Sequence, residues 1–314
     1  MIKCFLWLNL LSFLCFGQLI KSYKNFDDRI EIELPEGTLC VYPLTENAAR
    51  INFFISQKSD LLELILTSSV KAPKFEVTEN PDKIELKMNK LKIFIDKKTS
   101  SISYADANGN VFLSEKAGSR KLTPGEIMGE TCYAAEQSFL SPADENIFGL
   151  GQFQDGNYNL KNVARRLTQV NSQIAIPFVY SSKGYGLLWN QYGLTDFNPA
   201  DNKIELHKQV QVENKENKTA EVTTTAGTKT ISQNQSLYQG KFSVPKDGEY
   251  SIFLNLGDMD NRQSVVIDGE PVIDLSNLWL PPTIGKLVNL KSGEHDIQVV
   301  CKTENIPELF WKLS

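Results

Sequence analysis

Two aspartates stand two positions apart in the segment "GDMDNR", at Asp258 and Asp260. Paired carboxylates catalyse glycoside hydrolysis when they flank one bond, roughly 5 Å apart in retaining enzymes and roughly 6.5–9.5 Å apart in inverting ones. On a strand, side chains two residues apart share a face, but in a loop this spacing fixes no distance. EF-hand spacing is absent, so a calcium loop is only the second alternative. We favour a charged turn between strands and predict no catalytic and no metal-binding residues.

A second candidate is the glycine-rich segment "ENIFGLGQFQDG", residues 145–156. A dinucleotide-binding loop requires G-x-G-x-x-G between a strand and a helix. Here the third glycine comes two residues late and no amphipathic helix follows, so the spacing argues against a phosphate site. The segment is then either a bare turn or part of a pocket for a polar, uncharged ligand.

Aromatic and amide side chains gather around and after this segment. Proteins bind sugars by placing an aromatic ring under the C–H face and by hydrogen-bonding the hydroxyls with amides or carboxylates. Composition alone favours the alternative, in which the aromatics belong to a sandwich core and the amides cap turns. The residues concerned are Phe153, Tyr158, Tyr185, Trp189 and Tyr192 with Gln152, Gln154, Asn157, Gln169, Asn171 and Asn190.

Other catalytic and cofactor signatures are missing from the sequence, which has no G-x-S-x-G, H-E-x-x-H or Walker motif. His207 and His295 stand alone, as surface or core histidines do more often than metal ligands. The net charge of −5 argues against a nucleic-acid-binding face. We predict no cofactor and no nucleic-acid partner.

The elements that must position these residues are strands. "RIEIEL", "KIELKM" and "LKIFID" alternate apolar and polar residues at period two, with turn formers between them. Asn108-Gly109 predicts a hairpin turn because both residues tolerate positive φ. No run of ten or more residues keeps a helical stripe. The sequence therefore predicts an all-β protein built from antiparallel sandwiches.

A domain boundary is predicted near residue 218, in a polar stretch rich in Thr, Asn and Gln. An alternative is that this stretch forms a pair of exposed strands. A second β pattern follows, with tight turns at Asp247-Gly248, Asp268-Gly269 and Ser292-Gly293. The predicted organisation is a leader over residues 1–17, one sandwich over 18–217 and a second over 218–314.

The first residues, "MIKCFLWLNLLSFLCFGQ", combine a lysine with an apolar run too short to span a bilayer. This pattern predicts a secretory signal cleaved after Gly17, and hence a secreted or periplasmic protein without a membrane span. An apolar N-terminal strand is the alternative. A lipidated Cys15 is less favoured, because "SFL" matches a lipobox poorly. The cysteines that remain are widely scattered, which indicates free thiols or at most one bridge: Cys40, Cys132 and Cys301.

The segment "IFGLGQFQDG…LKNVARRLTQVNSQIAIPFVYSSKGYGLLWN" resembles the galactose-mutarotase-like N-terminal domain of glycoside hydrolase family 31, the α-glucosidases and α-xylosidases. The resemblance spans roughly residues 30 to 200. The family motif N-x-x-I-x-I-P is matched by Asn171, Ile174, Ile176 and Pro177. The motif S-S-x-G-Y-G-L-L-W-x-N is matched by Ser181, Ser182, Gly184, Tyr185, Gly186 and Trp189.

Residues 218–314 resemble a PA-14 β-sandwich, which some α-xylosidases of this family carry as an insert. "GEYSIFLNLGD" and "VVIDGEPVID" are two of the segments that carry this similarity. Many sugar-binding PA-14 domains use adjacent aspartates with calcium. The Asp258-Met259-Asp260 of this chain departs from that pattern.

The resemblance implies a carbohydrate-binding role at the rim of an active site, and it assigns this role to Gln152, Gln154 and Asn171. It also implies that the catalytic (β/α)₈ barrel, with its aspartate nucleophile and acid, is missing from these 314 residues. We therefore expect a non-catalytic portion of an exported α-xylosidase-like enzyme, whose partners are an oligosaccharide or polysaccharide and a barrel encoded downstream. A stand-alone secreted carbohydrate-binding or adhesion module of two sandwiches is the alternative.

Overall fold

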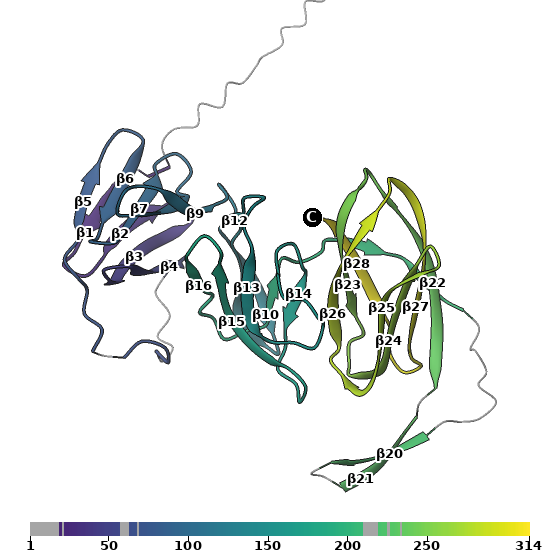
Figure 1. The fold of residues 1–314 in the computed structure, drawn as a ribbon. Coiled ribbons are helices and arrows are strands. Elements are labelled where there is room, and N and C mark those ends of the chain that lie inside the picture. Colours follow the sequence, from purple (N-terminus) through teal and green to yellow (C-terminus); the bar gives the residue numbers. More distant parts are fainter. Residues whose placement is uncertain are drawn as a thin grey trace, which may run out of the picture. The chain divides into compact units, whose positions relative to one another are not determined.

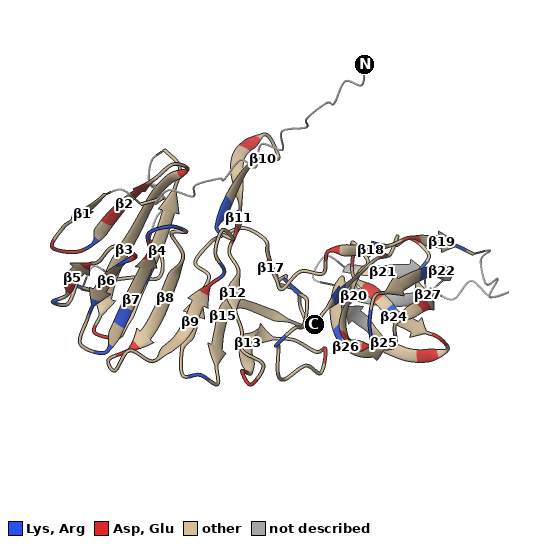
Figure 2. Cartoon of the chain, turned by 90° about the horizontal axis from the view of Figure 1, so that it is seen from above, with Lys and Arg blue, Asp and Glu red and all other residues tan. Residues whose placement is uncertain are grey.

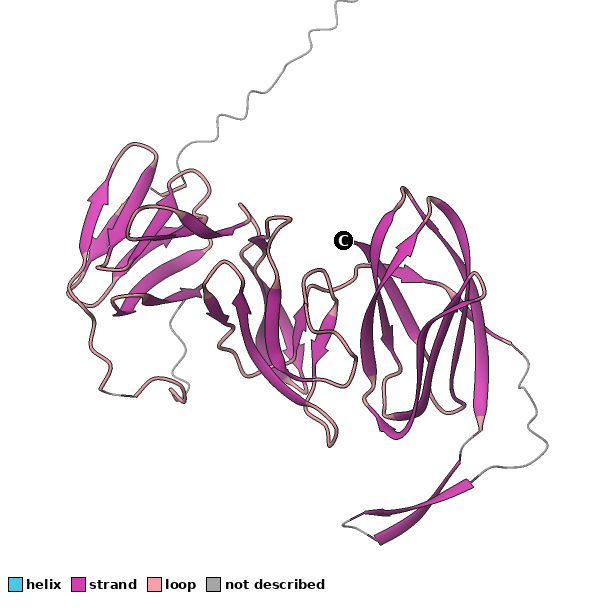
Figure 3. Ribbon diagram, viewed as in Figure 1, coloured by secondary structure: helices cyan, strands magenta, loops and turns pink. Residues whose placement is uncertain are grey.

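The computed structural model describes residues 19–20, 22–56, 63–67, 69–209, 219–224, 227–232 and 234–314. Within these ranges it consists of strands, turns and loops (Figure 3), which confirms the all-β prediction. No helix in the described ranges is long and apolar enough to cross a membrane.

The chain forms two compact units, residues 1–143 and 144–314. The leader predicted for residues 1–17 lies outside the described residues, as do positions 217 and 218 at the predicted domain boundary. The division into 18–217 and 218–314 therefore stays a prediction.

The first unit contains two antiparallel sheets (Figure 1). Buried side chains from both sheets form one apolar core. One sheet consists, in spatial order, of β1 (Tyr23–Asn25), β2 (Ile30–Leu34), β3 (Gly37–Thr45) and β4 (Ala48–Phe54). The other contains β5 (Glu76–Glu79), β6 (Lys83–Lys87), β7 (Leu91–Asp96), β8 (Ile102–Asp106), β9 (Val111–Glu115) and β12 (Phe139–Leu140), in the order β12-β9-β8-β7-β6-β5. A separate hairpin pairs β10 (Lys121–Ile127) with β11 (Glu130–Glu136).

Strand β7 shows how period two sets the two faces of this unit. Leu91, Ile93 and Ile95 are buried and join the core, while the residues between them are only partly buried. The predicted hairpin at Asn108-Gly109 is confirmed, because β8 pairs with β9. Of its two central residues only Gly109 has a positive φ, of 91°. The Asp106 side chain caps the turn by accepting hydrogen bonds from the backbone N–H groups of Asn108 and Asn110.

The second unit begins with two small sheets. One consists of β13 (Ile147–Gln152), β15 (Ile174–Ser181) and β16 (Gly186–Leu188), and the other of β14 (Arg165–Leu167) and β17 (Thr195–Phe197). A two-stranded ribbon pairs β20 (Thr219–Thr224) with β21 (Gly227–Ser232), in agreement with the alternative that part of the polar stretch forms strands. Figure 2 shows acidic and basic residues interspersed along strands and turns.

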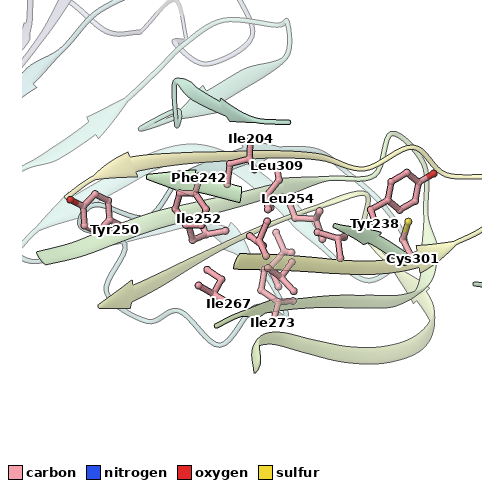
Figure 4. Packing of buried hydrophobic residues seen from close by; sticks show 14 of the residues in the cluster. Ile204, Tyr238, Phe242, Tyr250, Ile252, Leu254, Ile267, Ile273, Cys301 and Leu309 are labelled. Atoms are coloured by element: carbon pink, nitrogen blue, oxygen red, sulfur yellow. The ribbon is translucent and has the colours of Figure 1, made fainter. Parts of the chain in front are cut away.

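The remaining strands of this unit form a second sandwich, which we call the C-terminal sandwich. Its four-stranded sheet has, in spatial order, β18 (Asn202–Ile204), β28 (Glu308–Leu313), β23 (Gly248–Asn255) and β26 (Thr283–Leu290). Its five-stranded sheet has β19 (Leu206–Lys208), β22 (Gln235–Val244), β27 (Gly293–Lys302), β24 (Asp260–Ile267) and β25 (Glu270–Leu280). Side chains from both sheets, including the fully buried Tyr250, Ile252 and Cys301, fill the space between them (Figure 4).

A histidine clamp ties two turns of the C-terminal sandwich together. The His295 ring contacts the Asp268 carboxylate through Nδ1, at 2.6 Å, and the Lys291 carbonyl through Nε2, at 2.7 Å. Both partners are acceptors, so the protonated ring, which donates from both nitrogens, fits best. Burial lowers the pKa of His295, but the hydrogen bonds to Asp268 and Lys291 outweigh it, and the net pKa is raised above 6.5.

This clamp makes stability depend on pH. A group whose pKa is raised in the folded state stabilises that state at pH values below its unfolded-state pKa, here near 6.5. This stabilisation is lost as the pH rises through the folded-state pKa. We expect the Tm difference between the wild type and His295→Gln to shrink between about pH 5.5 and about pH 8.5. Thermal denaturation measures it, with the exposed His207→Gln as control. If the Tm values of the wild type and of His295→Gln changed with pH in parallel, the clamp would be refuted.

Candidate functional site

The Gly149-Leu150-Gly151 segment lies within strand β13, where it makes close backbone contact with β15. The pairing register shifts between Gly149 and Gly151, and the three residues have φ of 114°, 62° and 100°. A Cβ added at Gly149 would lie 2.5 Å from the Phe178 carbonyl oxygen, and one at Gly151 would overlap that of Ile174. Leu150 points into a small core with Ile147, Leu160 and Val179. The glycines therefore serve a bulge in a sheet, in agreement with the argument against a phosphate loop.

The three predicted rim residues are all exposed, in two neighbouring places. Gln152 ends β13 and is paired with Ile174, the first residue of β15. Asn171 lies in the tight Val170–Gln173 turn that leads into β15, and so at the same end of this strand pair. Gln154 lies two residues beyond Gln152, where it lines a hollow. Nothing in the structure tests whether these amides bind sugar, and the assignment stays a prediction.

The hollow next to Gln154 is small. Its walls come from the loop after β13, from β14, from the turn before β15 and from β23–β26 of the C-terminal sandwich, and its volume is about 20 Å³. This is room for about one water molecule, whereas pockets for whole ligands measure roughly 300–1,000 Å³. A sugar ring would have to lie on the exposed rim rather than inside.

A buried ion pair closes the loop that carries Gln154. Arg165 donates to the Asp155 carboxylate, and both side chains are at most one-tenth exposed. The Arg165 guanidinium also lies 4.2 Å from the centre of the Phe153 ring, which occupies one face of that aromatic. Asp155 in turn accepts a hydrogen bond from the Asn157 N–H. Phe153 is therefore part of the support of the loop rather than an exposed sugar platform.

The predicted aromatic and amide cluster is divided between support and surface. Tyr185 donates a hydrogen bond to Glu145 at 2.8 Å, and Gln169 accepts one from the Ala175 N–H. Tyr158 and Tyr192 are 80% and 56% exposed, and the Tyr158 ring contacts the Phe148 ring, with 5.1 Å between the ring centroids. Tyr185 and Gln169 therefore have the structural roles that composition alone favoured, and sugar binding by the exposed members stays a prediction.

A carboxylate missed by sequence reasoning, Glu145, explains the second family motif. It is 1% exposed and accepts hydrogen bonds from the Ser181 and Tyr185 hydroxyls. Burial, followed by the hydrogen bond to Glu145, raises the pKa of Tyr185 well above its usual range. The Ser and Tyr of S-S-x-G-Y-G therefore hold the start of β13 against the turn after β15. The available sequence signal was an acid two residues before an apolar strand.

The two aspartates of "GDMDNR" have different environments. Asp258 is exposed in the turn before β24, whereas Asp260 is 2% exposed at the start of the strand. Asp260 accepts hydrogen bonds from the backbone N–H groups of Asn261, Arg262 and Lys302 and from the Asn305 amide. The Asp260 carboxylate is thus bound by protein donors. Among the described residues, no group of three or more His, Cys, Asp or Glu side chains is arranged to hold a metal ion.

An exposed apolar row runs along one face of β15. Alternate residues of this strand point outward and are 40% to 49% exposed. Apolar patches of this kind mark interfaces more often than solvent-facing surface. The residues of the row are Ile174, Ile176, Phe178 and Tyr180.

Comparison with known proteins adds the family. Residues 38–198, just over half of the chain, match the family model of the glycosyl hydrolase 31 N-terminal galactose mutarotase-like domain. An α-xylosidase of Saccharolobus solfataricus is 32% identical over 122 residues, which cover 34% of this chain and 16% of that protein. Alpha-xylosidase A of Aspergillus niger is 36% identical over 73 residues, 23% of this chain and 9% of that one. The chain therefore matches about a sixth or less of the length of these relatives.

A solved structure shows a similar fold over most of the chain. The GH31 α-xylosidase of Xanthomonas citri superimposes with a TM-score of 0.67 and 21% identity, covering 92% of this chain and 35% of that one. At this identity the likeness shows the fold, and the family match carries the assignment. The chain belongs to the glycoside hydrolase 31 family and contains its N-terminal galactose mutarotase-like domain.

Proposed function

We propose that this chain is the non-catalytic N-terminal part of an exported family 31 α-glycosidase of the α-xylosidase type. Its substrates would be oligosaccharides of the xyloglucan type, cleaved on a (β/α)₈ barrel outside these residues. Gln152, Gln154 and Asn171 would bind sugar hydroxyls at the rim of the active site. The observation that carries the proposal is the family match over residues 38–198, together with the α-xylosidases among the relatives.

The state of the buried acids supports a non-catalytic role. In the described part of the chain the buried carboxylates are Glu115, Glu145 and Asp260. Glu115 pairs with Arg120, Glu145 accepts from the Ser181 hydroxyl, and Asp260 is held by backbone donors. A glycosidase needs one carboxyl to release a proton and another to attack or to activate water. Acids fixed by structural hydrogen bonds are poorly suited to both roles.

The exposed apolar row of β15 supports the proposal that a further domain covers this face. A row of aliphatic and aromatic side chains facing water is unfavourable, and burying it against another domain would remove that cost. We propose the barrel as that domain. For the C-terminal sandwich we propose a PA-14-type insert, in which the separated Asp258 and Asp260 replace the adjacent aspartates of calcium-binding members.

A second candidate function is a stand-alone secreted carbohydrate-binding module. The exposed Tyr158 and Tyr192 favour it, because exposed aromatic rings can stack on sugars without a barrel. The two candidates differ in affinity. If the rim is only part of a site that another domain completes, this chain alone binds sugar weakly. If the site is complete within this chain, it binds sugar tightly.

The purified chain is expected to leave aryl α-xylosides and α-glucosides intact. It is also expected to bind xyloglucan oligosaccharides with a Kd no better than about 1 mM, equivalent to roughly −4 kcal/mol. The physical reason is that one stacked ring and a few exposed hydrogen bonds supply little more than this. Calorimetry and a chromogenic assay measure the two quantities.

The matched variants are Asn171→Ala at the rim and Asn289→Ala, an exposed asparagine of β26. Micromolar binding that Asn171→Ala abolishes and Asn289→Ala preserves would establish the stand-alone module instead. Turnover above a boiled-protein control, lost on mutating one carboxylate of this chain, would overturn the non-catalytic assignment.

A further inference from the structure

We propose that a surface of the C-terminal sandwich formed by Ser251 and Gly285, which we call the seat, holds the rim segment, residues 152–165, in place. Gly285 is the positioning residue of this seat. The rim segment links β13 to β14 and carries Gln152 and Gln154. The functional meaning of the seat rests on the proposed sugar-binding rim, but its existence does not.

The rim segment and β26 are in backbone contact. A Cβ added at Gly285 would overlap the Ala164 carbonyl oxygen, and it would lie 3.4 Å from a methyl group of Val163. Only a residue without a side chain permits this approach. Gly285 does not have a positive φ. This position therefore requires glycine because of the space available and not because of the backbone conformation.

Two hydrogen bonds fix the contact on either side. Asn157 donates from its side-chain amide to the Gly285 carbonyl at 3.0 Å. The Ala164 N–H donates to the Ser251 hydroxyl at 3.0 Å, and Ser251 is 1% exposed. Because this N–H is buried, its alternative to Ser251 is an unpaired donor, which is costly. The rim segment therefore has a defined bonding pattern on the sandwich surface.

The rim segment is buried both where it packs against β13 and where it meets β26. Leu160 is 1% exposed and packs with Leu150 beneath β13. Val163 and Ala164 are 0% and 1% exposed at the β26 end. The Asp155–Arg165 pair draws the two ends of the segment together. The segment is thus anchored between β13 and the C-terminal sandwich, and the exposed Gln154 lies beside the hollow that it forms with the sandwich.

The consequence is mechanical. A loop held by few contacts opens locally at low cost, while a loop packed on a sheet opens only when the packing is lost. Strand β26 is an edge strand paired only with β23 in its sheet, and β14, which follows the rim segment, is in contact with it. Adding one methyl group at Gly285 should separate the rim segment from the sandwich while the rest of the sandwich stays folded.

Hydrogen exchange on the whole chain tests this, with Gly285→Ala compared with Gly248→Ala. A Cβ at Gly248 meets only side chains at ordinary distances, the nearest at 3.4 Å. In Gly285→Ala we expect amide exchange within residues 155–165 to rise about tenfold or more, while paired β22 and β27 amides stay protected. Ser251→Ala should raise exchange at Ala164 without a steric clash. Gly248→Ala should change neither region.

Unchanged exchange in residues 155–165 of Gly285→Ala would overturn the seat, as would an equal rise throughout the sandwich. Because exchange is measured without sugar, failure of the proposed binding function leaves this result interpretable. If sugar does bind the rim, Gly285→Ala should weaken binding and Gly248→Ala should not.

Discussion

Replacing Gly151 by alanine is expected to lower the free energy of unfolding by roughly 3 kcal/mol or more. Two costs add at this position. The residue has a φ of 100°, which alanine adopts only with strain, and the new methyl group would overlap the Ile174 carbonyl oxygen. Because β13 and β15 pair on both sides of this point, the strands must move apart or lose their register.

Gly156→Ala is the matched control, since it separates strain from overlap. Gly156 also has a positive φ, of 73°, but an added Cβ meets nothing within 4 Å. It should cost only about 1 kcal/mol, the price of the left-handed backbone. Denaturant unfolding of both variants gives the comparison. Equal losses would show that the close approach of β13 to β15 contributes nothing.

Asp260→Ala is expected to destabilise the chain by roughly 3 kcal/mol or more, while Asp258→Ala changes stability by about 0.5 kcal/mol or less. The carboxylate of Asp260 is buried and accepts hydrogen bonds from Lys302 N–H and from the Asn305 amide. Its removal leaves these donors unpaired in the interior. Asp258 is exposed and its loss can be compensated by water.

Thermal denaturation with added calcium separates this structural role from the alternative of a calcium loop. Calcium at millimolar concentration should leave the Tm of the wild type unchanged, because the Asp260 carboxylate is bound by protein donors. A calcium-dependent rise in Tm that disappears in Asp258→Ala would instead establish a metal site.

Much of the fold could be predicted from local pattern. In "LKIFID" the alternation of residues placed Leu91, Ile93 and Ile95 on one face, and the structure buries all three. This works because a strand presents alternate residues to opposite faces wherever it pairs. Asp268 and Gly269 have the positive φ of 50° and 85° that a tight two-residue hairpin turn requires. The Asn108-Gly109 hairpin also forms, but with one positive φ and an aspartate cap, because the side chain of Asp106 supplies what the backbone does not.

The candidate site was predictable only in part. The resemblance singled out the segment around Gln152 and Gln154, and the structure leaves both amides exposed. It could not show that Phe153 is covered by Arg165, or that Tyr185 is bound to Glu145. The residue type of an aromatic does not show whether its side chain faces solvent or supports a loop. Its role depends on the partner that folding brings next to it.

The sequence by itself determined the all-β class, the faces of the strands and the family, because these depend on periodicity and motifs that are local along the chain. Only the tertiary structure decided which glycine needs to be glycine and which aspartate is structural. Gly151 is constrained by Ile174, and Gly285 by Ala164, which lies more than a hundred positions earlier. Asp260 is held by donors at Lys302 and Asn305, whereas Asp258, two residues away, is exposed. Steric contacts and buried hydrogen bonds act over a few ångströms in space, and the chain brings such partners together only when it folds.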